Sequence, residues 1–206
     1  MARSLKLYSH AVAPNPRRVR IFAAEKGIEL GLEDIDILAG QSRTPEFLAK
    51  NSSGAVPVLE FDDGSCLSES VAICRYLEGL HPEPNLLGRD LREQAEIERW
   101  NRRMELELFA TIGRTVQNTS PIFQGRFKQF PDYGEAQRAT VYQRLERMDR
   151  ELRHQFVAGD RYTIADITAL VAIDIGILLA DIKIAPELAH LSRWHAAVSA
   201  RPSAKA

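Results

Sequence analysis

The loop at residues 9–16, with the sequence SHAVAPNP, separates a short apolar run from a helical pattern and has the features of a ligand-binding turn. In an open α/β sheet such a loop lies at the carboxyl end of a strand, where ligands gather. The dipole and the free N–H groups of a helix N-terminus in that position also lower the pKa of a thiol. The loop is therefore suited to a thiolate ligand.

Two later segments also carry residues suited to ligand binding. Pro57 follows Val56 just before an expected strand, where a proline removes a hydrogen-bond donor. A cis peptide bond, which would expose backbone groups to a ligand, is one reason for a proline at this position. The alternative is a trans bond, which is commoner. Glu69 and Ser70 follow Ser68, the expected cap of a helix. Free N–H groups and the Ser70 hydroxyl there suit a carboxylate, and Glu69 suits an ammonium. The alternative is an ordinary first helical turn, in which acids and serines are common.

Hydrophobic periodicity predicts the elements that position these residues. Up to about residue 80, short apolar runs alternate with helical patterns, which is typical of an α/β unit with the order βαβαββα. The turn at 62–64 predicts a hairpin between the last two strands. We place this first domain at residues 1–81 and a proline-containing linker at 82–89. The expected strands cover residues 5–8, 32–37, 56–61 and 65–67, and the first helix begins at Pro16.

After the linker every pattern has the period of a helix, which predicts an all-helical domain over residues 90–206. The expected helices cover about 90–118 and 134–156, and two shorter ones begin near Thr163 and Pro186. Thr163 and Asp166 have the spacing of a capping box. The helix that they begin is apolar almost all round, so we expect it at the centre of this domain.

Composition limits the classes of function. The 27 Lys and Arg residues nearly balance the 28 Asp and Glu residues, so no global field favours nucleic acid or an acidic membrane face. Cys66 and Cys74 have neither disulfide nor zinc spacing, and no histidine has ligand spacing, so no metal site is expected. No segment has the pattern of a signal peptide or a membrane span. We expect a soluble cytoplasmic protein that acts on a small molecule, without nucleic-acid or membrane partners.

In this order, the motifs resemble the glutathione S-transferase family along almost the entire chain. The resemblance implies an N-terminal thioredoxin-like domain that binds glutathione as a co-substrate, an all-helical domain that shapes the second-substrate site, and a homodimer. The residues that carry it are Leu5-Lys6-Leu7-Tyr8-Ser9, Ala13-Pro14-Asn15-Pro16-Arg17-Arg18-Val19, Pro45-Glu46-Phe47-Leu48, Gly54-Ala55-Val56-Pro57-Val58-Leu59, Glu69-Ser70, Ile73, Tyr76-Leu77 and Thr163-Ile164-Ala165-Asp166.

The resemblance also implies a binding site. Val56 makes strand-like backbone bonds to the cysteinyl part of glutathione, with Pro57 in the cis form. Glu69 and Ser70 hold the γ-glutamyl amino and carboxylate groups. The loop with Ser42 and Arg43 faces the glycyl end.

The chain departs from the family at the group that activates the thiol. Theta-like members have a donor serine two residues before a proline, and here Ala13 stands at the serine and Asn15 at the proline. Ala13 has no side-chain donor. The Ala-Pro-Asn pattern resembles bacterial nu-type members, which implies Asn15 as the catalytic donor and leaves Ser9 as the fallback. The alternative for Asn15 is a loop-stabilising role.

Other residues have competing interpretations. Met104, Leu108 and Phe109 lie at helical spacing and are expected to line an apolar second-substrate pocket or, equally, to form core and dimer contacts. Arg17, Arg18 and Arg20 are expected to form a solvated basic face.

The reaction implied by the resemblance is attack of the glutathione thiolate on a small hydrophobic electrophile, as in detoxification. Two alternatives stay open. One is a glutathione-dependent disulfide reductase without a catalytic cysteine. The other is a non-catalytic binding module of the same family. It is favoured because relatives have polar or longer residues at the positions of Ala13, Ser42 and Ala55.

Overall fold

The computed structural model describes residues 5–206, which form two compact units. The first unit extends to Asn85 and also includes Pro202–Ala206, and the second comprises Leu86–Arg201. The division after Asn85 falls inside the segment expected as a linker. The last five residues group with the first unit instead of the helical region, because they pack against its first helix.

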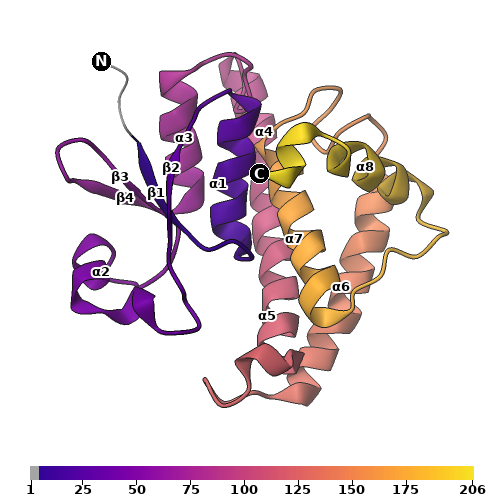
Figure 1. Ribbon diagram of the computed structural model, residues 1–206. Coiled ribbons are helices and arrows are strands. Elements are labelled where there is room, and N and C mark those ends of the chain that lie inside the picture. The colour runs from indigo at the N-terminus through magenta and orange to yellow at the C-terminus, as the bar shows by residue number, and fades with distance from the viewer. Residues whose placement is uncertain (1–4) are drawn as a thin grey trace. The chain divides into compact units, whose positions relative to one another are not determined.

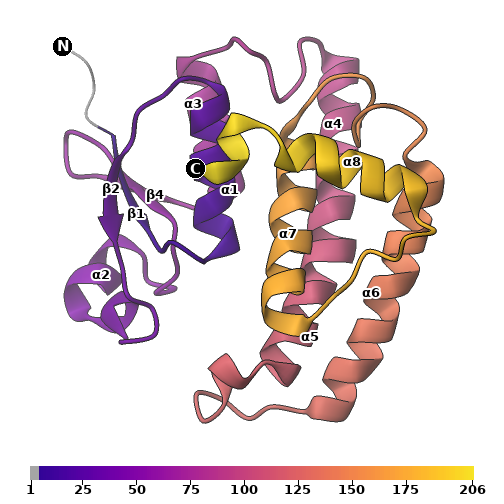
Figure 2. The ribbon, with the colours of Figure 1, turned by 45° about the vertical axis from the view of Figure 1, so that its right-hand side comes forward.

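A four-stranded sheet with the order β2-β1-β3-β4 forms the first unit (Figures 1 and 2). β1 (Lys6–Ser9) is parallel to β2 (Gly31–Asp34) and antiparallel to β3 (Val58–Glu60), which forms the expected hairpin with β4 (Cys66–Ser68). The predicted βαβαββα order is therefore confirmed. The second strand is shorter than expected: the Ile35 N–H still donates to the Ser9 carbonyl, at 2.7 Å, but β1 ends there. The next residues form a turn instead, in which the Asp36 N–H donates to Gln41 Oε1 at 2.8 Å and the Gln41 N–H donates to the Asp36 carbonyl at 3.0 Å.

Helices cover both faces of this sheet (Figure 1). Side chains alternate along β1, so Leu7 faces α1 (Pro14–Glu25) and α3 (Ser70–Leu80), whereas Tyr8 packs against Phe47 of α2 (Pro45–Lys50). α2 follows a short 3₁₀ turn, η1 (Gln41–Arg43), and Thr44 Oγ1 caps it by accepting from the Phe47 N–H. The C-terminal 3₁₀ turn η4 (Pro202–Lys205) lies against α1, where Arg17 Nη2 donates to the Ala204 carbonyl at 2.9 Å.

The second unit is all helical, as predicted (Figure 2). Its first three helical segments run without a break, because a π-helical segment, η2, joins two α-helices. The helix at Pro131–Glu151 begins with a proline in its first turn and packs against the helix at Ala110–Thr119, and the helix at Ile164–Ala180 packs against the π-helical segment. The elements are α4 (Leu91–Arg103), η2 (Met104–Phe109), α5 (Ala110–Thr119), η3 (Pro121–Phe123), α6 (Pro131–Glu151), α7 (Ile164–Ala180) and α8 (Ala189–Ser199).

The predicted capping box at the start of α7 is confirmed, and a buried carboxylate is its centre. Asp166 Oδ2 accepts from the Thr163 N–H at 3.0 Å, while Oδ1 accepts from the Val157 N–H at 2.9 Å and from Trp194 Nε1 at 2.8 Å. Burial raises the pKa of Asp166 to about 6, against the opposing effect of these hydrogen bonds. One carboxylate thus joins the loop before α7, the start of α7 and α8.

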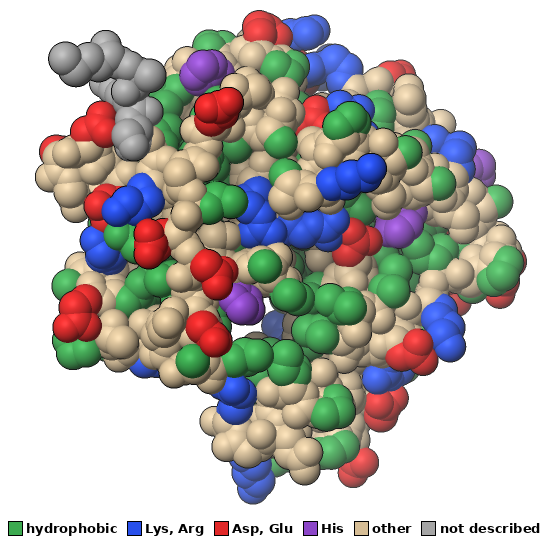
Figure 3. All heavy atoms as spheres, in the orientation of Figure 1, with side chains coloured by type: hydrophobic (Ala, Val, Ile, Leu, Met, Phe, Trp, Pro, Cys, Tyr) green, Lys and Arg blue, Asp and Glu red, His purple; other side chains and the backbone are tan. Residues whose placement is uncertain are grey.

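Acidic and basic side chains are intermixed on the face of the molecule shown in Figure 3. This agrees with the near balance of charges in the sequence. Within residues 5–206, no helix combines the length and the apolar character needed to cross a lipid bilayer.

We predict that Asp166→Ala lowers the free energy of unfolding by about 3–5 kcal/mol, because it leaves several buried donors without an acceptor. Denaturant unfolding followed by tryptophan fluorescence measures the loss. The matched control is Asp160→Ala, since the Asp160 side chain is 77 % exposed and a substitution there is expected to have little effect.

The same pair of proteins also tests the pKa of Asp166. Because the native carboxyl binds its proton more tightly than the unfolded chain does, stability from this group increases as the pH falls through 6. The difference between wild type and Asp166→Ala is therefore expected to grow by about 1.4 kcal/mol between pH 7.5 and pH 5. A difference that shrinks toward pH 5 would contradict this prediction.

Candidate functional site

The start of α1 is poor in backbone donors. The helix begins at Pro14, two residues earlier than expected, and Ala13 is its N-cap without a side-chain hydrogen bond. Pro14 and Pro16 have no N–H, and the Arg17 N–H already donates to the Ala13 carbonyl at 3.2 Å. Asn15, whose residue surface is exposed, therefore supplies the only backbone N–H of the first three helical positions. Any further donor at this helix start must come from a side chain.

Arg18 links the start of α1 to the start of α3. Its side chain is fully buried, and its Nη1 donates to Ser70 Oγ at 2.6 Å and to Asn15 Oδ1 at 3.2 Å. The structure thus brings together Asn15 and Ser70, two of the residues singled out from the sequence. The expectation that Arg18 lies on a solvated face was wrong. The missed signal is its spacing of four residues from Phe22, which puts Arg18 on the buried face of the helix.

The start of α3 combines a helix end that has no side-chain cap with an exposed carboxylate. Glu69 is the N-cap with φ of 70°, a left-handed conformation that is strained for a residue with a side chain, and α3 has no side-chain cap. Ser68, which we expected to cap the helix, belongs to β4, because the sharp turn at Glu69 separates it from the helix. Among the described residues, none forms a hydrogen bond or ion pair with the Glu69 carboxylate. This pairing of groups is complementary to an α-amino acid.

The backbone of Val56 is left without hydrogen bonds inside the described chain. The Val56-Pro57 bond is cis, as the family resemblance implied. Val56 is 8 % exposed and packs with Tyr8 and Phe47, yet its N–H and carbonyl form no hydrogen bond within the described chain. Buried backbone groups are nearly always paired, so this position suits an extended ligand that supplies the missing partners.

Ser42 and Arg43 approach the backbone that leads into Val56. Ser42 is buried, whereas Arg43 is exposed and donates from Nη1 to the Ser53 carbonyl at 3.0 Å. Gly54 has φ of 62°, and a Cβ atom there would lie 2.7 Å from Arg43 Nη1 and 2.8 Å from the Ser42 carbonyl oxygen. The two residues therefore fix the course of the chain toward Val56.

The Ser9 hydroxyl lies on another side of α1. Ser9 Oγ accepts from Arg20 Nη1 at 2.7 Å and lines a cavity of about 500 Å³. Arg18 and Arg20 are two residues apart, and thus about 200° apart around the helix. The cavity is shared with Ala11, Arg17, Arg20, Leu32, Asp34 and residues 204–206. This geometry favours Asn15 over Ser9 as the donor near Ser70.

The candidate second-substrate residues lie on the π-helical segment η2. Met104 and Leu108 are 5 % and 2 % exposed and, with Met148 of α6, line a cavity of only about 10 Å³. Phe109 is half-buried. The contacts of Met104 and Leu108 inside the helical unit fit the core role that was their alternative.

The two cysteines are free thiols with raised pKa values. Burial raises the pKa of Cys74 to about 12, and it also raises that of the half-buried Cys66. Neither lies in the loop at 9–16, and a thiol that stays protonated is a poor nucleophile. Within residues 5–206, no cluster of three or more His, Cys, Asp or Glu side chains could hold a metal ion.

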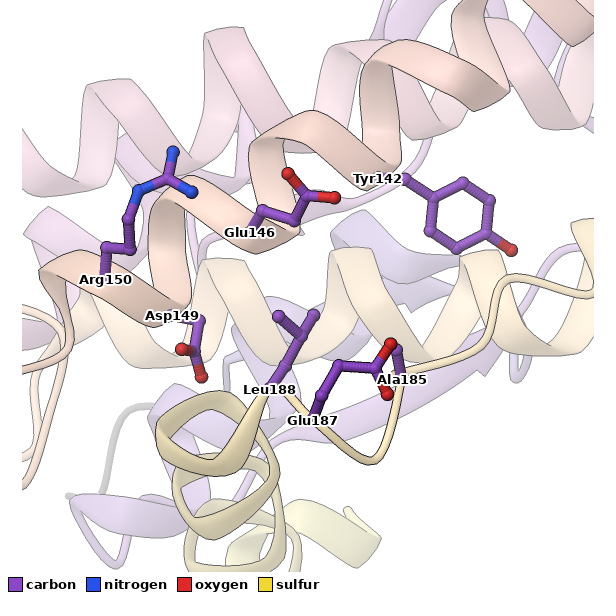
Figure 4. Close-up of a pocket in the computed structure, with 7 residues that line it drawn as sticks. All are labelled: Tyr142, Glu146, Asp149, Arg150, Ala185, Glu187 and Leu188. Carbon is purple, nitrogen blue, oxygen red and sulfur yellow. The ribbon is translucent and has the colours of Figure 1, made fainter.

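A cavity of about 340 Å³ in the helical unit has an acidic lining (Figure 4). Glu146 and Asp149 of α6 and Glu187 of the segment before α8 line it, with Arg150 as the only basic group among its lining residues. Glutathione carries two carboxylates and one ammonium, so like charges would oppose its binding there. The first unit provides the better match.

Comparisons with known proteins agree with these features. Residues 3–79 match the family model "Glutathione S-transferase, N-terminal domain", and residues 116–202 match "Glutathione S-transferase, C-terminal domain". The chain is 33 % identical over 210 residues to glutathione S-transferase 2 of Saccharomyces cerevisiae, covering 100 % of this chain and 90 % of the yeast protein.

Solved structures give the same result. A glutathione S-transferase domain-containing protein from Marinobacter aquaeolei matches with a TM-score of 0.91 and 37 % identity, over 96 % of this chain and 98 % of that one. The crystal structure of Gtt2 from Saccharomyces cerevisiae matches with a TM-score of 0.90 and 33 % identity, over 97 % and 98 % of the two chains. The fold therefore extends across both units.

We predict that Gly54→Ala lowers the free energy of unfolding by about 2–4 kcal/mol, through backbone strain and contact with the Ser42 carbonyl. The control is Gly64→Ala, because Gly64 also has a positive φ, of 80°, but a Cβ there meets no atom within 4 Å. Chemical denaturation of both variants measures the two losses, and equal losses would show that the contact has no effect.

Proposed function

Because the chain belongs to the glutathione S-transferase family, we propose that it binds glutathione as a co-substrate and transfers it to a small hydrophobic electrophile. The observation that carries this proposal is the start of α3, where an uncapped helix end and the Ser70 hydroxyl adjoin the exposed Glu69 carboxylate. The helix end attracts the γ-glutamyl carboxylate, and Glu69 attracts the ammonium. Few ligands other than an α-amino acid group meet both requirements.

The rest of glutathione extends from this anchor. The backbone of its cysteinyl residue pairs with the N–H and carbonyl of Val56. Pro57 then turns the protein backbone away from the bound glutathione. The glycyl carboxylate reaches the positive charge of Arg43, next to Ser42. These assignments are supported by the unpaired backbone of Val56 and by the approach of Ser42 and Arg43 to Gly54.

Asn15 stabilises the thiolate in this proposal. Its side-chain amide donates to the sulfur, which favours the charged form and lowers the thiol pKa. The thiolate then attacks the electrophilic carbon: an S–C bond forms, and a leaving group such as halide departs with the bonding electron pair. The protein contributes mainly positioning and stabilisation of the anion. Of the three apolar residues expected to contact the electrophile, half-buried Phe109 remains the proposed contact, because Met104 and Leu108 are buried in the core of the helical unit.

We predict that Asn15→Ala raises the thiol pKa of bound glutathione by about one to two pH units, since a hydrogen bond to a charged group contributes about 1.5–3 kcal/mol. Titration of the ultraviolet absorbance of the thiolate measures this change. Ser9→Ala, the competing candidate, is expected to leave the pKa as in wild type. If only Ser9→Ala raised the pKa, Ser9 would replace Asn15 as the donor.

Disulfide reduction is the second candidate function, and the Ala-Pro-Asn start of α1 favours it. The raised pKa values of Cys66 and Cys74 oppose a mechanism that uses the chain's own thiols, so reduction would consume two glutathiones. We predict higher activity with an aryl halide than with a small hydroxyalkyl disulfide in parallel assays. The reverse ranking would make reduction the main reaction.

A non-catalytic module would fail both assays. Retention of the protein on immobilised glutathione, together with a thermal shift on adding free glutathione, distinguishes a module that still binds glutathione from one that does not. We further propose that the protein is a cytoplasmic homodimer. Light scattering of the purified protein measures its molar mass and so tests the dimer.

A further inference from the structure

The buried guanidinium of Arg18 contacts two groups that the proposed function assigns to different parts of glutathione. Nη1 of Arg18 lies 3.2 Å from Asn15 Oδ1 and 2.6 Å from Ser70 Oγ. Asn15 is three residues before Arg18 on the same helix, whereas Ser70 begins another helix. Neither the family comparison nor the sequence pattern assigns a role to Arg18.

The chemistry of the guanidinium determines the direction of both hydrogen bonds. Arginine has five N–H donors, no acceptor, and a charge that persists at all accessible pH values. The atom of Asn15 that faces Arg18 is therefore the oxygen, so its NH₂ group points away from Arg18. Ser70 Oγ likewise accepts from Arg18, which leaves the Ser70 O–H free to donate elsewhere.

This direction matters because the start of α1 has few other donors. Pro14 and Pro16 supply no N–H, so the helix end alone offers a thiolate only the N–H of Asn15. An asparagine whose amide could rotate would present its oxygen to the thiolate part of the time, which is repulsive. A fixed amide presents the NH₂ group throughout.

We propose that Arg18 is a positioning residue that orients the Asn15 amide toward the glutathione thiolate and the Ser70 hydroxyl toward the γ-glutamyl carboxylate. The inference rests on the proposed function. It predicts that one buried side chain couples the contacts made to two residues of the bound tripeptide, the central cysteine and the γ-glutamyl group. Its charge also favours both anions, but the coupling comes from the hydrogen bonds.

A double-mutant cycle tests this coupling. We expect Arg18→Met, which keeps an apolar stem in the buried site, to raise the thiol pKa of bound glutathione about as much as Asn15→Ala and to weaken glutathione binding about tenfold. In the Asn15→Ala background, Arg18→Met is expected to raise the thiol pKa by clearly less than it does in wild type, because only the effect of the lost positive charge remains. Additive effects of the two substitutions on the thiol pKa would overturn the proposal.

Two further variants separate positioning from general effects on the fold. Arg18→Lys keeps a cation that can donate but not accept hydrogen bonds. Compared with Arg18→Met, it is expected to bring the thiol pKa, and the acid limb of the pH–kcat/KM profile, part of the way back to wild type. The matched control is Arg17→Met, because the Arg17 side chain donates to the Ala204 carbonyl and not to Asn15 or Ser70. It is expected to leave the thiol pKa and the pH–kcat/KM profile unchanged. A pKa rise with Arg17→Met equal to that with Arg18→Met would also overturn the proposal.

A neutron structure of the wild-type protein without glutathione gives a test that no variant can confound. Deuterium on Nδ2 of Asn15 is expected on the side away from Arg18, and an amide turned the other way would refute the assignment. If wild type fails to bind immobilised glutathione, the proposed function fails first and this role falls with it. If wild type binds and the cycle is additive, only the role of Arg18 is refuted.

Discussion

Hydrogen bonds and ion pairs of buried charged side chains join separate segments in both units of this protein. Arg18 of α1 is fully buried, and its Nη1 donates to Asn15 of the same helix and to Ser70 at the start of α3. Lys26, 5 % exposed, pairs with Glu78 at 2.6 Å and donates to the carbonyls of residues 81 and 84, each at 2.7 Å. Removing a group from water is costly unless such contacts replace it. Each buried group therefore fixes the relative positions of the segments that surround it.

Asp166 has the same role in the helical unit. Its carboxylate receives donors from the loop before α7, from the start of α7 and from α8. Desolvation nevertheless outweighs these bonds, as the raised pKa of Asp166 shows. The network thus gives a defined arrangement of helices at some cost in stability near neutral pH.

The groups that the fold leaves without partners define the candidate site. Val56 has an unpaired backbone, and Glu69 holds an exposed carboxylate in a strained left-handed conformation. Such strain costs about 1–3 kcal/mol and persists where the surrounding structure and a function maintain it. Arg18, Lys26 and Asp166 therefore make hydrogen bonds inside the chain, whereas the Val56 backbone and the Glu69 carboxylate make none with the described residues.

Local sequence signals determined much of the architecture. The hairpin and the capping box of α7 depend on neighbouring residues, and the structure confirms both. The start of α3 was mispredicted at Ser68, because the positive φ of Glu69 is imposed by its surroundings and not by its own conformational preference.

By itself, the sequence determined the order of elements, the all-helical second half and the residue types of the site, since periodicity and capping act over a few positions. Only the tertiary structure decided which of these residues meet. Arg18 contacts Asn15 one helical turn away, but its contact with Ser70 spans 52 positions and requires α1 to pack against α3. The sequence pattern could not reveal that contact, because burial of a charged side chain depends on partners that the fold supplies from distant segments.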